Sequence, residues 1–162
     1  MRSPRWLALT VLFAVAACVK TVTPAPRSIA PAHVAVVSTI GLDALGLRID
    51  VPGGAGVAAG DRPGSLVVTS ASGWRLTVDE GSPADTLAVA LAAAARLDAR
   101  DVETQETDDG HWMTFERTGL IGETHGLQLV RRLGTRVYRC EALVARRDEA
   151  RAALAACKTL RR

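Results

Sequence analysis

An apolar leader that ends at Cys18 decides in which compartment the rest of this chain folds. Arg2 and Arg5 lie beside the start of the apolar run Trp6–Ala17, and small residues stand directly before the cysteine. This layout is typical of a secretory signal peptide that is removed after export. A transmembrane helix needs about 20 apolar residues, and this run stops at Lys20. We therefore predict a chain that folds in an oxidising compartment outside the cytoplasm.

Residues 15–18 read Val-Ala-Ala-Cys, which resembles the lipobox of bacterial lipoproteins. The resemblance implies a signal peptide over residues 1–17, a diacylglycerol on Cys18 and a fatty acid such as palmitate on the new amine. Two acyl signals suffice for stable membrane anchoring. Such lipoproteins stay at the inner membrane when aspartate follows the cysteine. Val19 stands here, so the resemblance implies the outer membrane and a domain that faces the periplasm. An ordinary cleaved signal peptide is the alternative.

The mature chain divides into a tether and a domain. Pro24, Pro26 and Pro31 exclude regular structure, so residues 18–39 are predicted to form a lipidated N-terminus and a proline-rich tether. The remaining residues, 40–162, are enough for a single domain with its own core.

Acidic and basic residues separate along this domain. Acidic residues dominate from 40 to 110 and basic residues dominate from 111 to 162, although the net charge is only +3. Because antiparallel strands commonly pair opposite charges, we predict that the two halves neutralise each other across one sheet. The alternative is contact between the basic half and anionic lipid head groups. Nucleic acid is excluded as a partner, since the basic residues are not interleaved with stacking aromatics and the chain is exported.

Alternating apolar and polar residues predict three strands at the start of the domain. From Leu45 to Val51 every second residue is apolar, as in a half-buried strand, and Pro52 ends the pattern. Leu66–Thr69 and Trp74–Val78 flank a short turn and are predicted to form a hairpin.

The glycine-rich stretch between these strands matches a nucleotide-binding loop in spacing alone. Gly54, Gly56 and Ala59 have the spacing of a dinucleotide-binding motif. That motif requires a helix directly after it, because the N-terminal amides of the helix bind pyrophosphate. Gly60 and Pro63 exclude such a helix. We therefore predict a mobile loop here, and no cofactor.

A helix is predicted to begin at residues 82–85. Ser-Pro-Ala-Asp at these positions offers a capping hydroxyl, a proline for the first helical position and a carboxylate three residues after the cap. The helix should extend to about residue 98 with its apolar stripe toward a sheet. The stripe consists of Leu87, Leu91, Ala94 and Ala95.

Two further hairpins are predicted in the second half of the domain. One joins residues 102–107 to 111–117 through an Asp-Gly turn, and the other joins 126–133 to 136–144 through Gly-Thr. With a closing helix, the elements predict an α+β fold in the order βββα ββββ α. About six to seven strands form its antiparallel sheet, which carries the two helices.

A disulfide between Cys140 and Cys157 is predicted to hold the closing helix against the sheet. Asp148 caps a helix that runs from Glu149 to about Leu160, with Cys157 on its apolar face. Cys140 lies on the interior face of the preceding strand, and an even pair in an exported chain favours oxidation. A closed loop of this length contributes about 3 kcal/mol of stability. The alternative is two buried free thiols.

Neither a metal site nor a catalytic site is predicted. His111 and His125, with Asp108 and Asp109 nearby, are the conceivable metal ligands, but their spacing matches no closed zinc pattern and two aspartates are typical of a turn. No Gly-x-Ser-x-Gly motif supplies a nucleophile, and His33 is interpreted as a solvated tether residue. The polar surroundings of four candidate paired carboxylates indicate solvated strand faces. They belong to Glu103, Glu106, Glu116 and Glu123.

The order of elements over residues 40–160, with the opening strand and Pro52, resembles the PsbP-like α/β sandwich. The resemblance implies an accessory or assembly role rather than catalysis. The first hypothesis is a non-enzymatic binding or scaffolding lipoprotein that meets a protein partner in the envelope. The alternative is a carrier or sensor that holds a small ligand in a pocket between sheet and helix, and a hydrolase is the third hypothesis.

Overall fold

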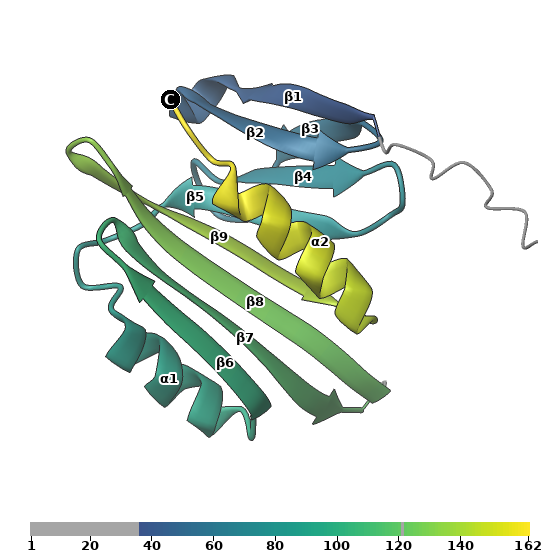
Figure 1. The fold of residues 1–162 in the computed structure, drawn as a ribbon, viewed down its shortest axis with the longest axis vertical. Coiled ribbons are helices and arrows are strands. Elements are labelled where there is room, and N and C mark those ends of the chain that lie inside the picture. Colours follow the sequence, from purple (N-terminus) through teal and green to yellow (C-terminus); the bar gives the residue numbers. More distant parts are fainter. Residues whose placement is uncertain (1–35, 121) are drawn as a thin grey trace, which may run out of the picture. The chain divides into compact units, whose positions relative to one another are not determined.

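A computed structural model describes residues 36–120 and 122–162, and this part of the chain contains nine strands and two α-helices (Figure 1). The signal peptide, Cys18 and most of the tether lie outside the described residues, so what the sequence indicates about them stays a prediction. No described helix has the length and apolar character needed to span a bilayer.

The elements follow one another as three groups along the chain. Five strands come first, then a helix, then four strands and a second helix. Their bounds are β1 (Val37–Leu42), the short 3-10 helix η1 (Asp43–Leu45), β2 (Leu47–Pro52), β3 (Ala55–Ala59), β4 (Leu66–Ser70), β5 (Arg75–Glu80), α1 (Leu87–Arg96), β6 (Arg100–Thr107), β7 (Gly110–Gly119), β8 (Gly122–Leu133), β9 (Arg136–Val144) and α2 (Arg147–Lys158).

Seven of the strands form one antiparallel sheet in the order β3-β4-β5-β9-β8-β7-β6, and β1 and β2 form a separate hairpin. The helix α2 packs on β8, β9 and β2, whereas α1 packs on β7. Trp112 joins the core beneath α2 and Met113 packs against α1. Since successive residues of a strand point to opposite faces, the two helices cover opposite faces of the sheet. The α+β class is therefore confirmed.

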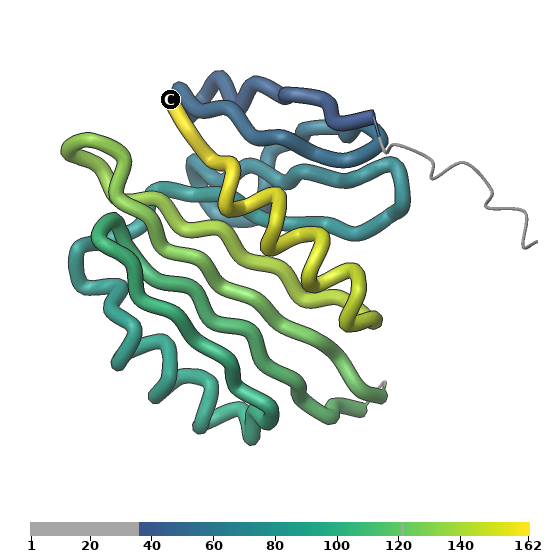
Figure 2. The backbone as a smooth tube through the Cα atoms, in the orientation of Figure 1, coloured from purple at the N-terminus to yellow at the C-terminus, as the bar shows by residue number. Residues whose placement is uncertain are grey.

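The main core lies between α2, the sheet and the β1–β2 hairpin. Its largest fully buried side chains are Tyr138, Leu42, Ile49, Leu76 and Leu160. The end of the chain runs beside β2, as Figure 2 shows, and the amide of Arg48 donates to the carbonyl of Arg161 at 2.7 Å. The first hairpin and the last residues of the chain thus close the same core.

Cys140 of β9 and Cys157 of α2 are joined by a disulfide inside this core. Both side chains are fully buried, and their Cα atoms are 6.0 Å apart. The arrangement is compatible with the predicted pairing and connects the closing helix to a central strand of the sheet.

The predicted neutralisation of the two halves is visible as ion pairs. Arg139 of β9 donates to both carboxylate oxygens of Asp79 on β5, at 3.1 and 3.0 Å. The two residues are direct partners in the antiparallel register. Arg161, which follows α2, contacts Asp50 of β2 at 2.8 Å, outside the seven-stranded sheet. Arginines from the basic half therefore meet aspartates from the acidic half, and the first pair does so across neighbouring strands.

Two strands are absent from the sequence prediction. β1 begins at Val37, inside the predicted tether, and β3 occupies Ala55–Ala59, inside the predicted mobile loop. β1 pairs with β2 around a left-handed Gly46, and β3 pairs with β4. Five strands, not three, therefore precede α1. The small, mostly exposed residues of β3 lack the alternation that marks a half-buried strand, so only its pairing defines it.

Both helix starts also differ from the prediction. Thr86 caps α1 by accepting a hydrogen bond from the amide of Val89 at 3.3 Å. Ser82 and Asp85 instead close a turn before the helix, where the Ser82 amide donates to the Asp85 carboxylate. At α2 the N-cap is Arg146, which has no side-chain capping bond, while the predicted cap Asp148 lies in the first turn.

The inward face of α1 was predicted correctly at Ala94 and wrongly at Leu91 and Ala95, which are exposed. Ala90 and Ala94 are buried against Met113, whereas Leu91 remains exposed. Ala90 thus takes the inward position that was predicted for Leu91. Two alanines allow the helix backbone to approach the sheet more closely than leucine would.

Candidate functional site

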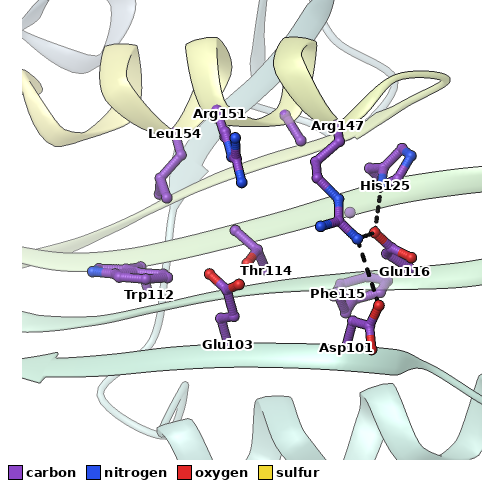
Figure 3. A pocket seen from close by; sticks show the side chains of 12 residues that line it. Asp101, Glu103, Trp112, Thr114, Phe115, Glu116, His125, Arg147, Arg151 and Leu154 are labelled. Carbon is purple, nitrogen blue, oxygen red and sulfur yellow. Dashed lines mark hydrogen bonds and ion pairs between the residues drawn. The ribbon is translucent and has the colours of Figure 1, made fainter. Parts of the chain in front are cut away.

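A charged cleft lies between α2 and the edge of the sheet formed by β6 and β7. Carboxylates project from the strands and arginines from the helix, around a cavity of about 80 Å³ (Figure 3). Arg147 donates to Glu116 and also reaches Asp101 at 3.5 Å. The Nδ1 atom of His125 lies 3.3 Å from the Glu116 carboxylate. Glu116 is thus the centre of a small ion-pair network.

The Arg147 hydrogen bond lowers the pKa of Glu116 below its ordinary value, so this carboxylate stays ionised. Glu116, Glu123 and His125 place one possible ligand atom each within 4.8 Å of one another. Carboxylates and imidazole are zinc ligands. Since the guanidinium of Arg147 already compensates Glu116, this arrangement is explained as an ion pair that holds the first turn of α2 to β7.

The two histidines considered as metal ligands lie on opposite faces of the sheet. His125 faces α2, while His111 lies on the α1 face of the sheet and is buried. Burial lowers the pKa of His111, and its Nε2 atom has no hydrogen-bond partner among the described residues. Asp109 accepts a hydrogen bond from Arg131 instead of approaching either imidazole. The four candidate ligands therefore form no common site.

Of the four candidate carboxylates, the structure brings two together. Glu116 and Glu123 share the cluster with His125, and Glu103 lines the same cleft from β6. Glu106 faces the α1 side, because its partner in the register is His111. Ion pairing with arginine, rather than the solvated strand face expected from the sequence, accounts for the half-buried Glu116.

A larger groove lies on the opposite face of the sheet, between α1 and strands β7, β8 and β9. It consists of two hollows of about 330 and 270 Å³ that share lining residues from α1, β8 and β9. We call this surface the α1 groove. Its shared residues are Ala90, Ala93, Gln128 and Glu141, and the apolar walls of the larger hollow include Ala94, Leu97, Met113, Phe115 and Leu143.

The α1 groove exists because α1 buries little of its apolar surface. Only Ala90 and Ala94 of this helix are buried. Val89 is 56% exposed and Leu97, directly after the helix, is 49% exposed. Leu143 of β9, on the far wall, is 53% exposed. A contiguous apolar surface of this kind on a folded domain marks a binding site more often than a scattered apolar residue does.

Gly126 of β8 makes room for Phe115, whose side chain lines both the α1 groove and the charged cleft. It pairs with Phe115 of β7 in the antiparallel register, and the Phe115 ring lies against its backbone. A Cβ atom at position 126 would overlap that ring. The glycine therefore allows the aromatic ring to lie against the backbone of β8.

The polar groups of the groove floor are mostly paired with one another. Glu141 accepts hydrogen bonds from Gln128 at 3.0 Å and from Arg62 at 2.9 Å, and Arg139 lies 3.3 Å from it. Arg117 of β7 differs from these groups. It is half-buried at the wall of the larger hollow, and within residues 36–120 and 122–162 no carboxylate lies within ion-pair distance of it.

Neither the unpaired Arg117 nor the apolar exposure of α1 was predicted from the sequence. The helix reads Leu-Ala-Val-Ala-Leu-Ala-Ala-Ala-Ala-Arg and is followed by Leu97, so apolar residues surround its whole circumference. A helix of this composition is buried on all sides or else presents an apolar surface. That signal was available in the sequence. The unpaired state of Arg117 was not, because it depends on strands far apart in the chain.

Neither a protein-family model nor a curated protein matches this sequence. The geometry of the charged cleft and of the α1 groove is therefore the basis for a functional conclusion.

Proposed function

We propose that this chain is a lipid-anchored, non-enzymatic binding protein of the cell envelope, and that its ligand occupies the α1 groove. The observation that carries the proposal is the open apolar groove between a helix and a sheet. The lipid anchor at Cys18 follows from the lipobox resemblance and would hold the domain at the outer membrane, facing the periplasm.

The groove has the composition of a site that binds. Ligand pockets of about 300–1,000 Å³ are lined mainly by apolar side chains with a few polar groups that orient the ligand. The larger hollow, of about 330 Å³, combines alanine, leucine, methionine and phenylalanine side chains with Arg117, Gln128 and Glu141. An ordinary guanidinium stays protonated and serves as a hydrogen-bond donor rather than as a general base. This combination favours the carrier or sensor hypothesis.

The outer side of α1 favours a second candidate function, the scaffolding role. Leu91 is 39% exposed, and it does not line the groove. A protein partner in the envelope would cover this side chain. The two functions differ in what they use, because a small ligand needs the hollow and a protein partner needs the convex side of the helix.

A neutral fluorescent dye tests the groove directly. The mature chain with Cys18→Ala, which lacks acyl chains of its own, is titrated with N-phenyl-1-naphthylamine. The variant Ala93→Trp places an indole in the part shared by both hollows, and Ala92→Trp places it on α1 away from the lining. We expect dye binding to the parent and to Ala92→Trp, and at least tenfold weaker binding to Ala93→Trp. Equal binding to both tryptophan variants, or none to the parent, refutes the proposal.

A further inference from the structure

We infer that the α1 groove takes an amphiphile with a long apolar chain and a single anionic head group, and that Arg117 binds the head group. This inference rests on the proposed binding function and adds the chemical class of the ligand. The apolar walls accept the chain, and the half-buried, unpaired guanidinium supplies the charge that a carboxylate or phosphate head complements.

The charge argument compares Arg117 with the other arginines of the same sheet face. Arg139 donates to Asp79, and Arg62 contacts both Asp79 and Glu141. Both guanidinium groups are therefore neutralised from within the protein. Arg117 is half-buried in the wall of the groove, and among the described residues it has no such partner.

A half-buried guanidinium without a partner is poorly solvated, so an incoming anion gains more from it than from a fully exposed arginine. Guanidinium groups bind carboxylate and phosphate oxygens through paired, charge-assisted hydrogen bonds. Glu141 does not provide an equivalent site for a cation. Its two oxygens already accept from Gln128 and Arg62, and Arg139 lies beside them. The groove therefore selects negative over positive head groups.

The apolar chain has a defined path beside this charge. Phe115 and Met113 precede Arg117 at two-residue intervals on β7, so the three side chains lie on one face of the strand. Four residues of strand cover about 13 Å. Ala93, Ala94 and Leu97 of the α1 region form the opposite wall along this path. A chain that starts at Arg117 can therefore lie between helix and strand with its head group at the rim.

The experiment uses the mature Cys18→Ala chain and measures displacement of N-phenyl-1-naphthylamine. Dodecanoate and dodecyltrimethylammonium, which have equal chain lengths and opposite charges, are compared below their micelle concentrations. We expect dodecanoate to bind at least tenfold more tightly than the cation. Arg117→Gln should weaken dodecanoate about tenfold more than it weakens the neutral dye. Arg75→Gln is the matched control, because Arg75 is an exposed arginine of β5 outside the groove lining.

Two results would overturn the inference. If both amphiphiles displace the dye equally, or if Arg117→Gln binds dodecanoate as tightly as the parent does, the guanidinium does not bind the head group. Dye binding by the parent would still support the groove as a binding site. Loss of dye binding by the parent chain, in contrast, refutes the proposed function itself. A photocrosslinker at Leu97 in intact envelopes distinguishes the source of the anion. A lipid adduct supports the inference, and a protein adduct alone would replace it with an acidic protein segment.

Discussion

Reduction of the disulfide between Cys140 and Cys157 should remove a large part of the stability of this domain. The bond closes a loop with a sequence separation of 17 residues. In the chain-entropy model the cost of closing such a loop in the unfolded state is about 10 cal/mol/K, or about 3 kcal/mol at 25 °C. Small domains have total unfolding free energies of about 5–15 kcal/mol, so the loss is a considerable fraction.

The assay is urea unfolding of the exported, oxidised chain with and without dithiothreitol. The double variant Cys140→Ala, Cys157→Ala is the control, because a reductant cannot change its covalent state. We expect the oxidised parent to exceed the reduced parent by about 3 kcal/mol in unfolding free energy, and the double variant to show no response. The slope of unfolding free energy against urea reports whether the unfolded state becomes less compact.

The reasoning fails if the parent responds to reductant by less than about 1 kcal/mol, the scale of ordinary substitutions. It also fails if alkylation of the exported chain under denaturing, non-reducing conditions modifies both cysteines. The first result would show that the disulfide does not restrict the conformations of the unfolded chain. The second would show that the buried pair is never oxidised.

Three further outcomes are expected. Cys18→Ala should abolish incorporation of radioactive palmitate and retention in the membrane fraction, and labelling that persists would exclude lipidation at this thiol. Gly126→Ala should lower the unfolding free energy by about 1–3 kcal/mol, since the new Cβ must displace the aromatic ring beside it, whereas Gly56→Ala, with open space around it, should change it little in urea titrations. The Arg161 hydrogen bond lowers the pKa of Asp50 from 3.8 to about 2. This pair therefore stabilises the fold above pH 4, and its contribution should be lost between about pH 4 and pH 2 in thermal melts compared with Asp50→Asn.

The sequence predicted the elements whose signals are local. Strands with strict alternation were recognised because every second side chain enters the core. The strand predicted over 45–51 is found at Leu47–Pro52, because Leu45 belongs to the 3-10 helix before it, and Arg136–Val144 has the predicted range. The closing helix and the position of Cys157 within it follow from helical spacing. These features depend on residues that lie close together in the chain, so apolar residues that recur every two or every 3.6 positions reveal them.

The elements that were missed depend on distant partners. Nothing within Ala55–Ala59 marks a strand until β4 pairs with it, and Val37–Leu42 needs β2 across a turn. The start of α1 shows the same limit. Both the Ser82 hydroxyl and the Thr86 hydroxyl can cap a helix, and the position of the helix on the sheet decides between them. Local capping rules permit both starts.

The candidate site was the least predictable part, because whether a side chain there is ion-paired or solvated depends on residues that are distant in the chain. Glu116 was considered as a solvated carboxylate, and the tertiary structure gives it Arg147 and His125 as neighbours. Arg117, next in the chain, points to the other face of the sheet. Adjacent residues of one strand thus belong to two different sites, and no sequence pattern separates their roles.

The two helices divide stability and binding between the two faces of the sheet. α2 buries five residues and is joined to β9 by the disulfide. α1 buries two alanines and leaves Val89 exposed, with Leu97 exposed directly after it. Apolar side chains that keep about half of their surface exposed contribute less to the unfolding free energy than buried ones, since unfolding exposes only the other half. Polar substitutions at Val89 and Leu97 should therefore lower the unfolding free energy by only about 1 kcal/mol each while they alter binding, and such a separation is what a surface retained for a ligand requires.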